Sequence, residues 1–275
     1  MTEKEENELK AICKKMRENC LTMAGAAGGL GFHFGAAMSI IEIVAVLYFK
    51  VMNSGVEAYE QRDRFILSKG HGVPALYAAL CCKEIISGEE LMTFKGDDTR
   101  LYGHPCKNKE LGIEFSSGSL GQGLSFGAGV AMALKRKGND TSRVFVLLGD
   151  GECNEGSVWE AAMTASKYKL GNLTAIIDRN HLQYDGDTEK VMPLDSLTDK
   201  WKSFGWEAEE ADGHDAGQLY AALMKKSALP RIVIADTIKG KGISFMENIP
   251  GWHFGRMTAE QEKNAWAEVT GNGNK

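Results

Sequence analysis

The chain has 275 residues, 43% of them hydrophobic and 25% charged, a globular balance that allows one large α/β domain or two smaller ones. A net charge of −5 lacks the basic excess that nucleic-acid and anionic-membrane binders use, and no apolar run is long enough to span a bilayer. The acidic N-terminus is not a secretory signal, and the six scattered cysteines suit a reducing compartment, so we expect a cytoplasmic protein.

Helical periodicity dominates the first half of the chain. Ser39 and Glu42 have the spacing of a capping box ahead of an apolar face. The pattern predicts helices at residues 5–23, 39–50, 74–86 and 123–137.

The second half alternates between strand and helix patterns. Residues 144–148, 173–177 and 232–235 are short apolar runs, typical of strands buried on both faces. Between the first two lies a predicted helix, 157–169, which Ser157 and Glu160 would open as a second capping box.

Strand, helix and strand in this order form a βαβ unit, which builds parallel sheets. We therefore predict an α/β fold with a mostly parallel sheet and helices on both faces. No repeat or linker divides the chain, so residues 1–275 are expected to form a single domain, with Thr258 and Gln261 capping a last short helix.

The segment Gly149-Asp150-Gly151 follows a predicted strand directly. The glycines let the backbone approach a bound anion, and the aspartate offers a hard oxygen ligand. Asn180 lies thirty residues after Asp150, at the end of the next strand, so both side chains should reach the same edge of the sheet. A diphosphate with Mg²⁺ satisfies these features.

This spacing resembles the thiamine diphosphate signature, and the surrounding sequence resembles transketolase along nearly the whole chain. The resemblance implies the thiamine diphosphate-binding fold, specifically its diphosphate-binding domain. The matching segments are GDGECNEGSVWEA, KLGNL, IDRNHLQYDG, LSKGHG, YGHP, SGSLGQG and DGHD.

The resemblance also implies roles for single residues. Asp150, Asn180 and the carbonyl of Leu182 would hold Mg²⁺, or Ca²⁺ or Mn²⁺ in its place. Glu155 would join a carboxylate network between two cofactor sites. The cofactor-binding set is His71, Gly118, Leu120, Asp150, Gly151, Glu155, Asn180 and Lys239.

The histidines divide into two groups. His33, His71, His104 and His253 match catalytic positions of the family, with His71 and His104 toward the diphosphate and substrate, and His33 and His253 toward donor hydroxyls. We interpret His181 and His214 as structural. The family's usual frame around the first histidine is replaced here by Phe32 and Phe34, which leaves the donor preference open.

Members of this family bind the cofactor between two domains, and the second domain supplies a catalytic glutamate. The chain ends at Lys275 without room for that domain, so we expect a separate C-terminal, pyrimidine-binding subunit in an α₂β₂ assembly. Together the two chains would transfer a two-carbon ketol unit from a ketose phosphate to an aldose phosphate.

Other interpretations stay open. The chain could be the diphosphate-binding subunit of a deoxyxylulose-phosphate synthase-like enzyme, the α-subunit of a 2-oxoacid dehydrogenase, or a non-catalytic thiamine diphosphate-binding module. A dinucleotide-binding protein is disfavoured, because GSLGQG is not the GxGxxG fingerprint.

Overall fold

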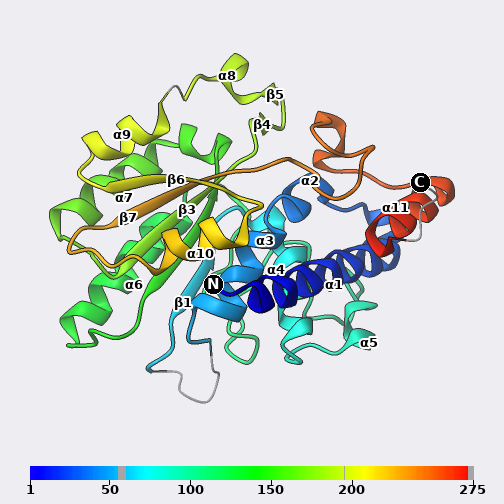
Figure 1. Ribbon diagram of the computed structural model, residues 1–275, viewed down its shortest axis with the longest axis horizontal. Helices are drawn as coiled ribbons and strands as arrows, with labels where there is room; N and C mark the ends of the chain where they lie inside the picture. The colour runs from blue at the N-terminus through cyan, green and yellow to red at the C-terminus, as the bar shows by residue number, and fades with distance from the viewer. Residues whose placement is uncertain (55–59, 195, 272–275) are drawn as a thin grey trace.

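A five-stranded sheet forms the centre of the computed structural model, which describes residues 1–54, 60–194 and 196–271 (Figure 1). All neighbouring strands pair in parallel, which confirms the predicted sheet type. In spatial order the strands are β1 (Arg64–Leu67), β2 (Val144–Gly149), β3 (Leu173–Arg179), β7 (Arg231–Asp236) and β6 (Glu207–Asp212).

Side chains alternate along the buried strands and divide the core into two clusters, one on each face of the sheet. On β2, Phe145 and Leu147 belong to one cluster, whereas Val144, Val146 and Leu148 belong to the other. Helices cover both faces, as predicted (Figure 1). The first cluster includes side chains of α1 (Glu3–Ala27), α3 (Ile41–Val46), α4 (Val73–Cys82) and α10 (Ala216–Met224), and the second those of α6 (Gly123–Arg136), α7 (Gly156–Lys167) and α9 (Leu197–Ser203).

Short elements connect this framework. The two-stranded antiparallel ribbon of β4 (Leu182–Gln183) and β5 (Gly186–Asp187) follows β3, and α11 (Ala259–Thr270) packs on α1. The remaining helical segments are η1 (Gly28–Leu30), α2 (Phe34–Met38), η2 (Leu47–Val51), η3 (Gly70–Gly72), α5 (Gly88–Leu91), η4 (Gly151–Asn154), α8 (Thr188–Val191) and η5 (Pro250–His253).

Both predicted capping boxes in the first two thirds of the chain are wrong. Ser39 does not cap α3, because its hydroxyl instead donates 2.7 Å to the buried carboxylate of Asp178. Ser157 lies inside α7 and donates to the carbonyl of Gly121 at 2.8 Å. In both cases an acceptor far away in the sequence takes the hydroxyl. The box of Thr258 at α11 is confirmed.

The predicted helix at 39–50 is also interrupted. It divides into α3 and a π-helical turn, η2, and the separate short helix α2 precedes it. The other predicted helices are present with shifted ends, and the three predicted strands are the central ones, β2, β3 and β7. Among the described residues, no helix combines the length and apolar content needed to cross a bilayer.

Candidate active site

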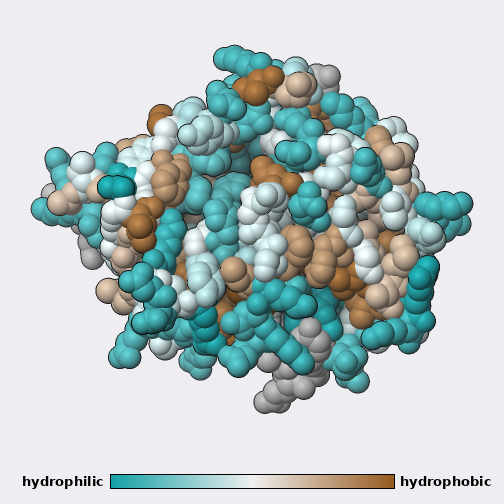
Figure 2. Space-filling model, turned by 180° about the vertical axis from the view of Figure 1, so that it is seen from behind, coloured by the Kyte–Doolittle hydropathy of each residue, from teal (hydrophilic) through white to brown (hydrophobic). Residues whose placement is uncertain are grey.

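A cavity of about 620 Å³ lies at the carboxyl ends of β1, β2, β3 and β7. Seen from behind, the surface is hollowed below the segment of β4, β5 and α8 (Figure 2). Ligands of open α/β sheets bind at this edge. The cavity lining includes every residue that the sequence placed in the site: His33, His71, His104, Gly118, Leu120, Asp150, Gly151, Glu155, Asn180, Leu182, Lys239 and His253.

Asp150 follows β2 directly and is buried. Its carboxylate accepts the backbone N–H groups of Gly151 and His181, both at 2.7 Å, and the Arg179 guanidinium lies 3.5 Å away. Burial raises the pKa of Asp150, and the neighbouring carboxylate of Asp178 acts in the same direction. A bound cation would offset both effects, which is the electrostatic situation of a metal ligand.

Asp178, near the end of β3, forms a fully buried ion pair with Lys69, which follows β1. Its carboxylate also accepts the hydroxyls of Ser39 and Thr237. Burial alone would raise the pKa of Asp178, but the Lys69 ammonium and these hydroxyls outweigh that effect and lower it. This pair was not predicted from the sequence. The sequence signal that could have placed Lys69 is strand β1, Arg64–Leu67, which ends two residues before it. The apolar run in this strand is too short to be recognised as a strand from the sequence.

This ion pair orients the predicted metal ligand Asn180. The side-chain Nδ2 of Asn180 donates to Asp178 at 2.8 Å, so the amide oxygen is the end left for other partners, and the backbone N–H of Leu182 donates to it at 3.2 Å. The carbonyl of Leu182 accepts the ammonium of Lys239 at 2.6 Å. One predicted ligand therefore already faces a positive charge. Burial, aided by nearby Lys69, lowers the pKa of Lys239 to about 8.

The predicted cofactor-binding glycines, Gly151 and Gly118, differ in the space around them. A Cβ at Gly151 would lie 2.8 Å from the Gln183 amide oxygen, so a side chain there would displace the ribbon residue. A Cβ at Gly118 would reach only the His104 ring, at 3.8 Å, so the backbone at this point borders open space. Bare backbone amides of this kind suit a bound anion.

Two acids beside the glycine loop differ in environment. Glu155, predicted to join a network between two sites, is exposed at the start of α7. Glu152, which was not singled out from the sequence, is buried and accepts the backbone N–H groups of Gly121 and Gly149 at 2.9 and 3.0 Å. Burial raises the pKa of Glu152, although these hydrogen bonds oppose the shift. Glu152 thereby ties the loop before α6 to the loop after β2.

The four histidines predicted to be catalytic, His33, His71, His104 and His253, form one cluster. The ring of His33 lies 5.7 Å from His71, 5.5 Å from His104 and 5.9 Å from His253 between centroids, and His71 stacks on His253 at 5.2 Å. Phe32 and Phe34, which flank His33, are both buried in the core and hold this residue from either side.

The pKa values of all four imidazoles are lowered, which favours their neutral forms. Burial lowers the pKa of His33 to about 3, with His104 as the next cause, and lowers that of His253 to about 4, with Lys239 next. Burial also lowers the pKa values of His71 and His104. Neutral rings can both donate and accept hydrogen bonds, and the Nδ1 atom of His253 is buried without a partner. An unsatisfied atom at this position suits a polar ligand.

The two histidines interpreted as structural do not line the cavity. His181 contacts Asp236 at 2.7 Å. His214 lies between two partners: its Nε2 accepts the backbone N–H of Ile238 at 2.8 Å and its Nδ1 lies 3.0 Å from Glu42.

The donor set fits a magnesium diphosphate. The described residues contain no cluster of three His, Cys, Asp or Glu side chains able to hold a metal by themselves. A carboxylate, an amide oxygen and a carbonyl are hard ligands, and Mg²⁺ usually completes its octahedron with phosphate oxygens and water. Asp150, Asn180 and Leu182 therefore suit a metal that arrives with its diphosphate.

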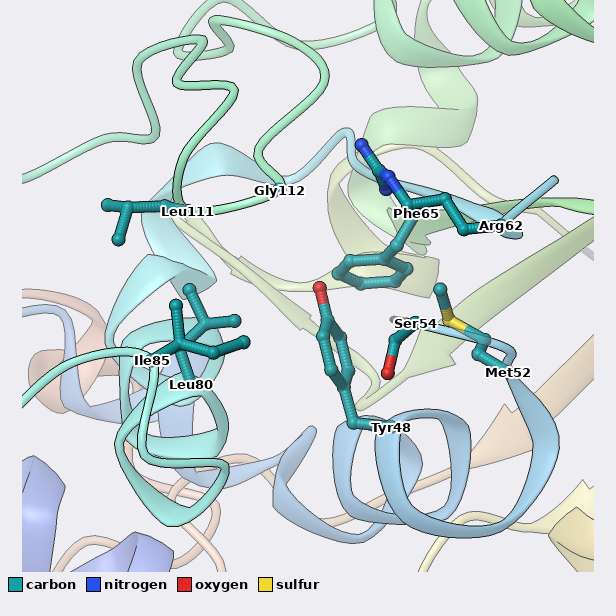
Figure 3. A pocket seen from close by; sticks show the side chains of 9 residues that line it. All are labelled: Tyr48, Met52, Ser54, Arg62, Phe65, Leu80, Ile85, Leu111 and Gly112. Atoms are coloured by element: carbon teal, nitrogen blue, oxygen red, sulfur yellow. The ribbon is translucent and has the colours of Figure 1, made fainter. Parts of the chain in front are cut away.

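A second cavity, lined by Tyr48, Arg62, Phe65 and Leu80 among others, has quite different dimensions (Figure 3). The Tyr48 and Phe65 rings meet edge to face at 5.6 Å, and the space between the lining residues is about 10 Å³. This volume suits a single water molecule at most. The candidate active site is the cavity at the strand ends.

The family model described as transketolase, thiamine diphosphate binding domain, matches residues 14–270. One of the subunits of the apulose-4-phosphate transketolase of Phocaeicola vulgatus is 44% identical over 243 residues, which cover 86% of each chain. The 6-deoxy-6-sulfo-D-fructose transketolase subunit SqwG of a Clostridium species is 40% identical, covering 88% of this chain and 89% of that one.

A crystal structure of transketolase from Campylobacter jejuni superposes with a TM-score of 0.86 at 28% identity. The superposition covers 95% of this chain but 42% of that one. Similar relatives thus include subunits of this chain's size as well as a much longer enzyme. The family match, the fold and the similarity to both kinds of relative lead to one conclusion: the chain belongs to the transketolase family and is its N-terminal, thiamine diphosphate-binding part.

Proposed function

We propose that this chain is the diphosphate-binding subunit of a two-chain transketolase. With its partner it would transfer a two-carbon ketol unit from a ketose phosphate to an aldose phosphate. The observation that carries the proposal is the joint lining of one cavity by hard oxygen ligands and neutral histidines. His33 comes from the first part of the chain and His253 from the last, which also supports treating residues 1–275 as a single domain.

The metal and the diphosphate would be held by this chain. Asp150, Asn180 and the Leu182 carbonyl would coordinate Mg²⁺, while Gly118, Leu120, Gly151, His71 and Lys239 would border the diphosphate. Lys239 supplies a positive charge for the phosphate oxygens. When bound, thiamine diphosphate would supply the electron sink for the negative charge that develops on the carbonyl carbon of the donor, which no protein side chain can do.

The histidines would handle the polar groups of the substrate. The lowered pKa values of His33, His104 and His253 favour neutral rings. A neutral imidazole can accept a proton from a donor hydroxyl and return it later, whereas a protonated ring would first have to release a proton. The rings of His104 and His253 each contact that of His33 edge to face, with centroids 5.5 and 5.9 Å apart, and all three rings line the same cavity. The cluster therefore supports acid–base work on a small polyol.

A partner chain is part of the proposal. Three relatives that match this chain over most of their own length are named as transketolase subunits, whereas the Campylobacter enzyme is much longer. The mouth of the cavity also leaves apolar side chains in solvent: Tyr184 is 72% exposed and Met192 is 57% exposed. A pyrimidine-binding subunit, paired as α₂β₂, would cover such a rim.

Donor profiling tests the reaction class. The assembled enzyme should use hydroxypyruvate with an aldose phosphate acceptor and release a ketose extended by two carbons. Pyruvate should not support this transfer, since it cannot provide a ketol unit. Turnover of pyruvate without use of hydroxypyruvate would instead place the chain among the 2-oxoacid or deoxyxylulose-phosphate enzymes.

A further inference from the structure

Three loops carry histidines of the cluster in the cavity: residues 28–33, 94–104 and 250–255. The first and third are joined by a backbone bridge, in which Phe32 and Gly255 exchange N–H···O bonds of 2.9 and 3.0 Å. Among the described residues, no backbone hydrogen bond joins the 94–104 loop to either of them, so this loop needs a side-chain attachment. Lys95 provides one.

The side chain of Lys95 reaches both other loops. Its ammonium donates to the carbonyl of Gly31 at 2.8 Å and lies 3.4 Å from that of Leu30. The same group lies 5.2 Å from the centroid of Phe254, a distance at which a cation attracts an aromatic face. The Phe254 ring in turn packs on His33 at 4.7 Å.

No carboxylate of the described residues competes for this ammonium. Within the described residues, no carboxylate lies within 4.0 Å of Lys95 Nζ, so the interactions of this group are with carbonyls and aromatic rings of the loops. An ammonium bonded in this way orders several backbone segments at once.

The surroundings are shaped for this side chain. Lys95 has a φ of +62°, a left-handed backbone conformation that is unfavourable for a residue with a Cβ atom. A Cβ at Gly103 would lie 2.6 Å from Lys95 Cε, so the glycine leaves the path of the lysine stem open. A glycine would be the natural residue at such a φ, and the presence of a lysine points to a use for the side chain.

We propose that Lys95 is a positioning residue for ketol transfer: its ammonium fixes the 28–33 loop and Phe254 against the 94–104 loop, and so holds His33 and His104 at the mouth of the cavity. The inference rests on the proposed function. A substrate phosphate is the rival partner of this ammonium. The existing bonds to Gly31 and Leu30 favour positioning, because a phosphate ligand would have to compete with them.

The positive charge of Lys95 also affects the pKa values of His33 and His104. His33 faces His71, His104, His253 and Lys95, and His104 faces His33 and Lys95. After burial and the other histidines, Lys95 also lowers the pKa of His33, and after burial it is the cause that lowers the pKa of His104. Loss of the cation should therefore raise both pKa values.

The first test uses the full chain without substrate. In Lys95→Met, hydrogen exchange of the Phe32 and Gly255 amides should be faster by on the order of tenfold, because a charged hydrogen bond is lost. Lys95→Arg should restore most of the protection. Lys83→Met is the matched control, since Lys83 lies 5.0 Å over the Phe49 ring away from the cavity. Unchanged exchange in Lys95→Met would overturn the proposal.

The second test titrates His33 and His104 by NMR and follows kcat/KM with pH in the assembled enzyme. In Lys95→Met both ring pKa values should rise, and the acid limb of kcat/KM should move to higher pH. Unmoved pKa values would overturn positioning, as would a KM increase confined to phosphorylated donors. Faster exchange in a chain that shows no ketol transfer even as wild type would instead refute the proposed function and leave the loop contact standing.

Discussion

Asp178→Ala is expected to destabilise the chain strongly while also weakening metal binding. The substitution removes the carboxylate that pairs with Lys69, whose side chain is buried, with 1% of its surface exposed. Stranding a buried ammonium costs about 3–5 kcal/mol. For a domain of this size each kcal/mol lowers Tm by about 2–4 °C, so a decrease on the order of 10 °C should follow.

Thermal unfolding and a double-mutant cycle measure this cost. Lys69→Met combined with Asp178→Ala should recover most of the lost stability, since the unpaired charge is then gone. Asp178→Asn keeps the volume but no longer fixes the Asn180 amide, and should weaken Mg²⁺-dependent cofactor binding by about tenfold. A loss below about 1 kcal/mol in Asp178→Ala, or additive losses in the double variant, would refute the reasoning.

Three further changes probe the cavity. Asp150→Asn keeps the side-chain volume but removes the charge, and its single amide oxygen can replace only one of the two carboxylate oxygens that accept the N–H groups of Gly151 and His181. Calorimetry should show Mg²⁺-dependent thiamine diphosphate affinity lower by about 100-fold, and unchanged affinity would remove the metal assignment. His104→Ala or His253→Ala should lower kcat by about 100-fold with little change in cofactor Kd. A loss of cofactor affinity as large as the loss of kcat would instead give these rings a binding role. Urea unfolding should show the free energy of unfolding falling as pH drops from about 6.5 toward 4, by up to about 1.4 kcal/mol per pH unit for each histidine ring of the cluster. The reason is that the pKa of His253 is about 4 in the folded chain, so the unfolded chain takes up the proton first. A free energy of unfolding that does not change over this pH range would contradict this.

The central strands and the motifs after them were predictable from the sequence because their signals are local. Residues 144–148, 173–177 and 232–235 are nearly continuous apolar runs, since both faces of these strands are buried. Asp150 and Asn180 follow two of these strands immediately, so placing them at one edge required only the parallel arrangement.

The missed features depend on partners that are distant in the sequence. Strand β6 lies at the edge of the sheet and reads EAEEAD, which lacks the apolar pattern of a buried strand. Lys69 and Asp178 are 109 residues apart, and neither neighbourhood shows that they meet. Ser39 has a complete local capping pattern, yet the buried carboxylate of Asp178 takes its hydroxyl, because a charged acceptor in the core is stabilised by each hydrogen bond that it accepts.

Reconstitution tests the central claim most directly. The purified chain, the pyrimidine-binding chain of a two-chain transketolase, and a mixture of both should be assayed separately for ketol transfer from hydroxypyruvate, with thiamine diphosphate and Mg²⁺ present. We expect activity in the mixture and none in either chain by itself, because in the proposed enzyme this chain would supply the diphosphate site and the histidine cluster, and the partner would supply the pyrimidine-binding surface. Full ketol-transfer activity from this chain alone, scaling with its purity, would contradict the account.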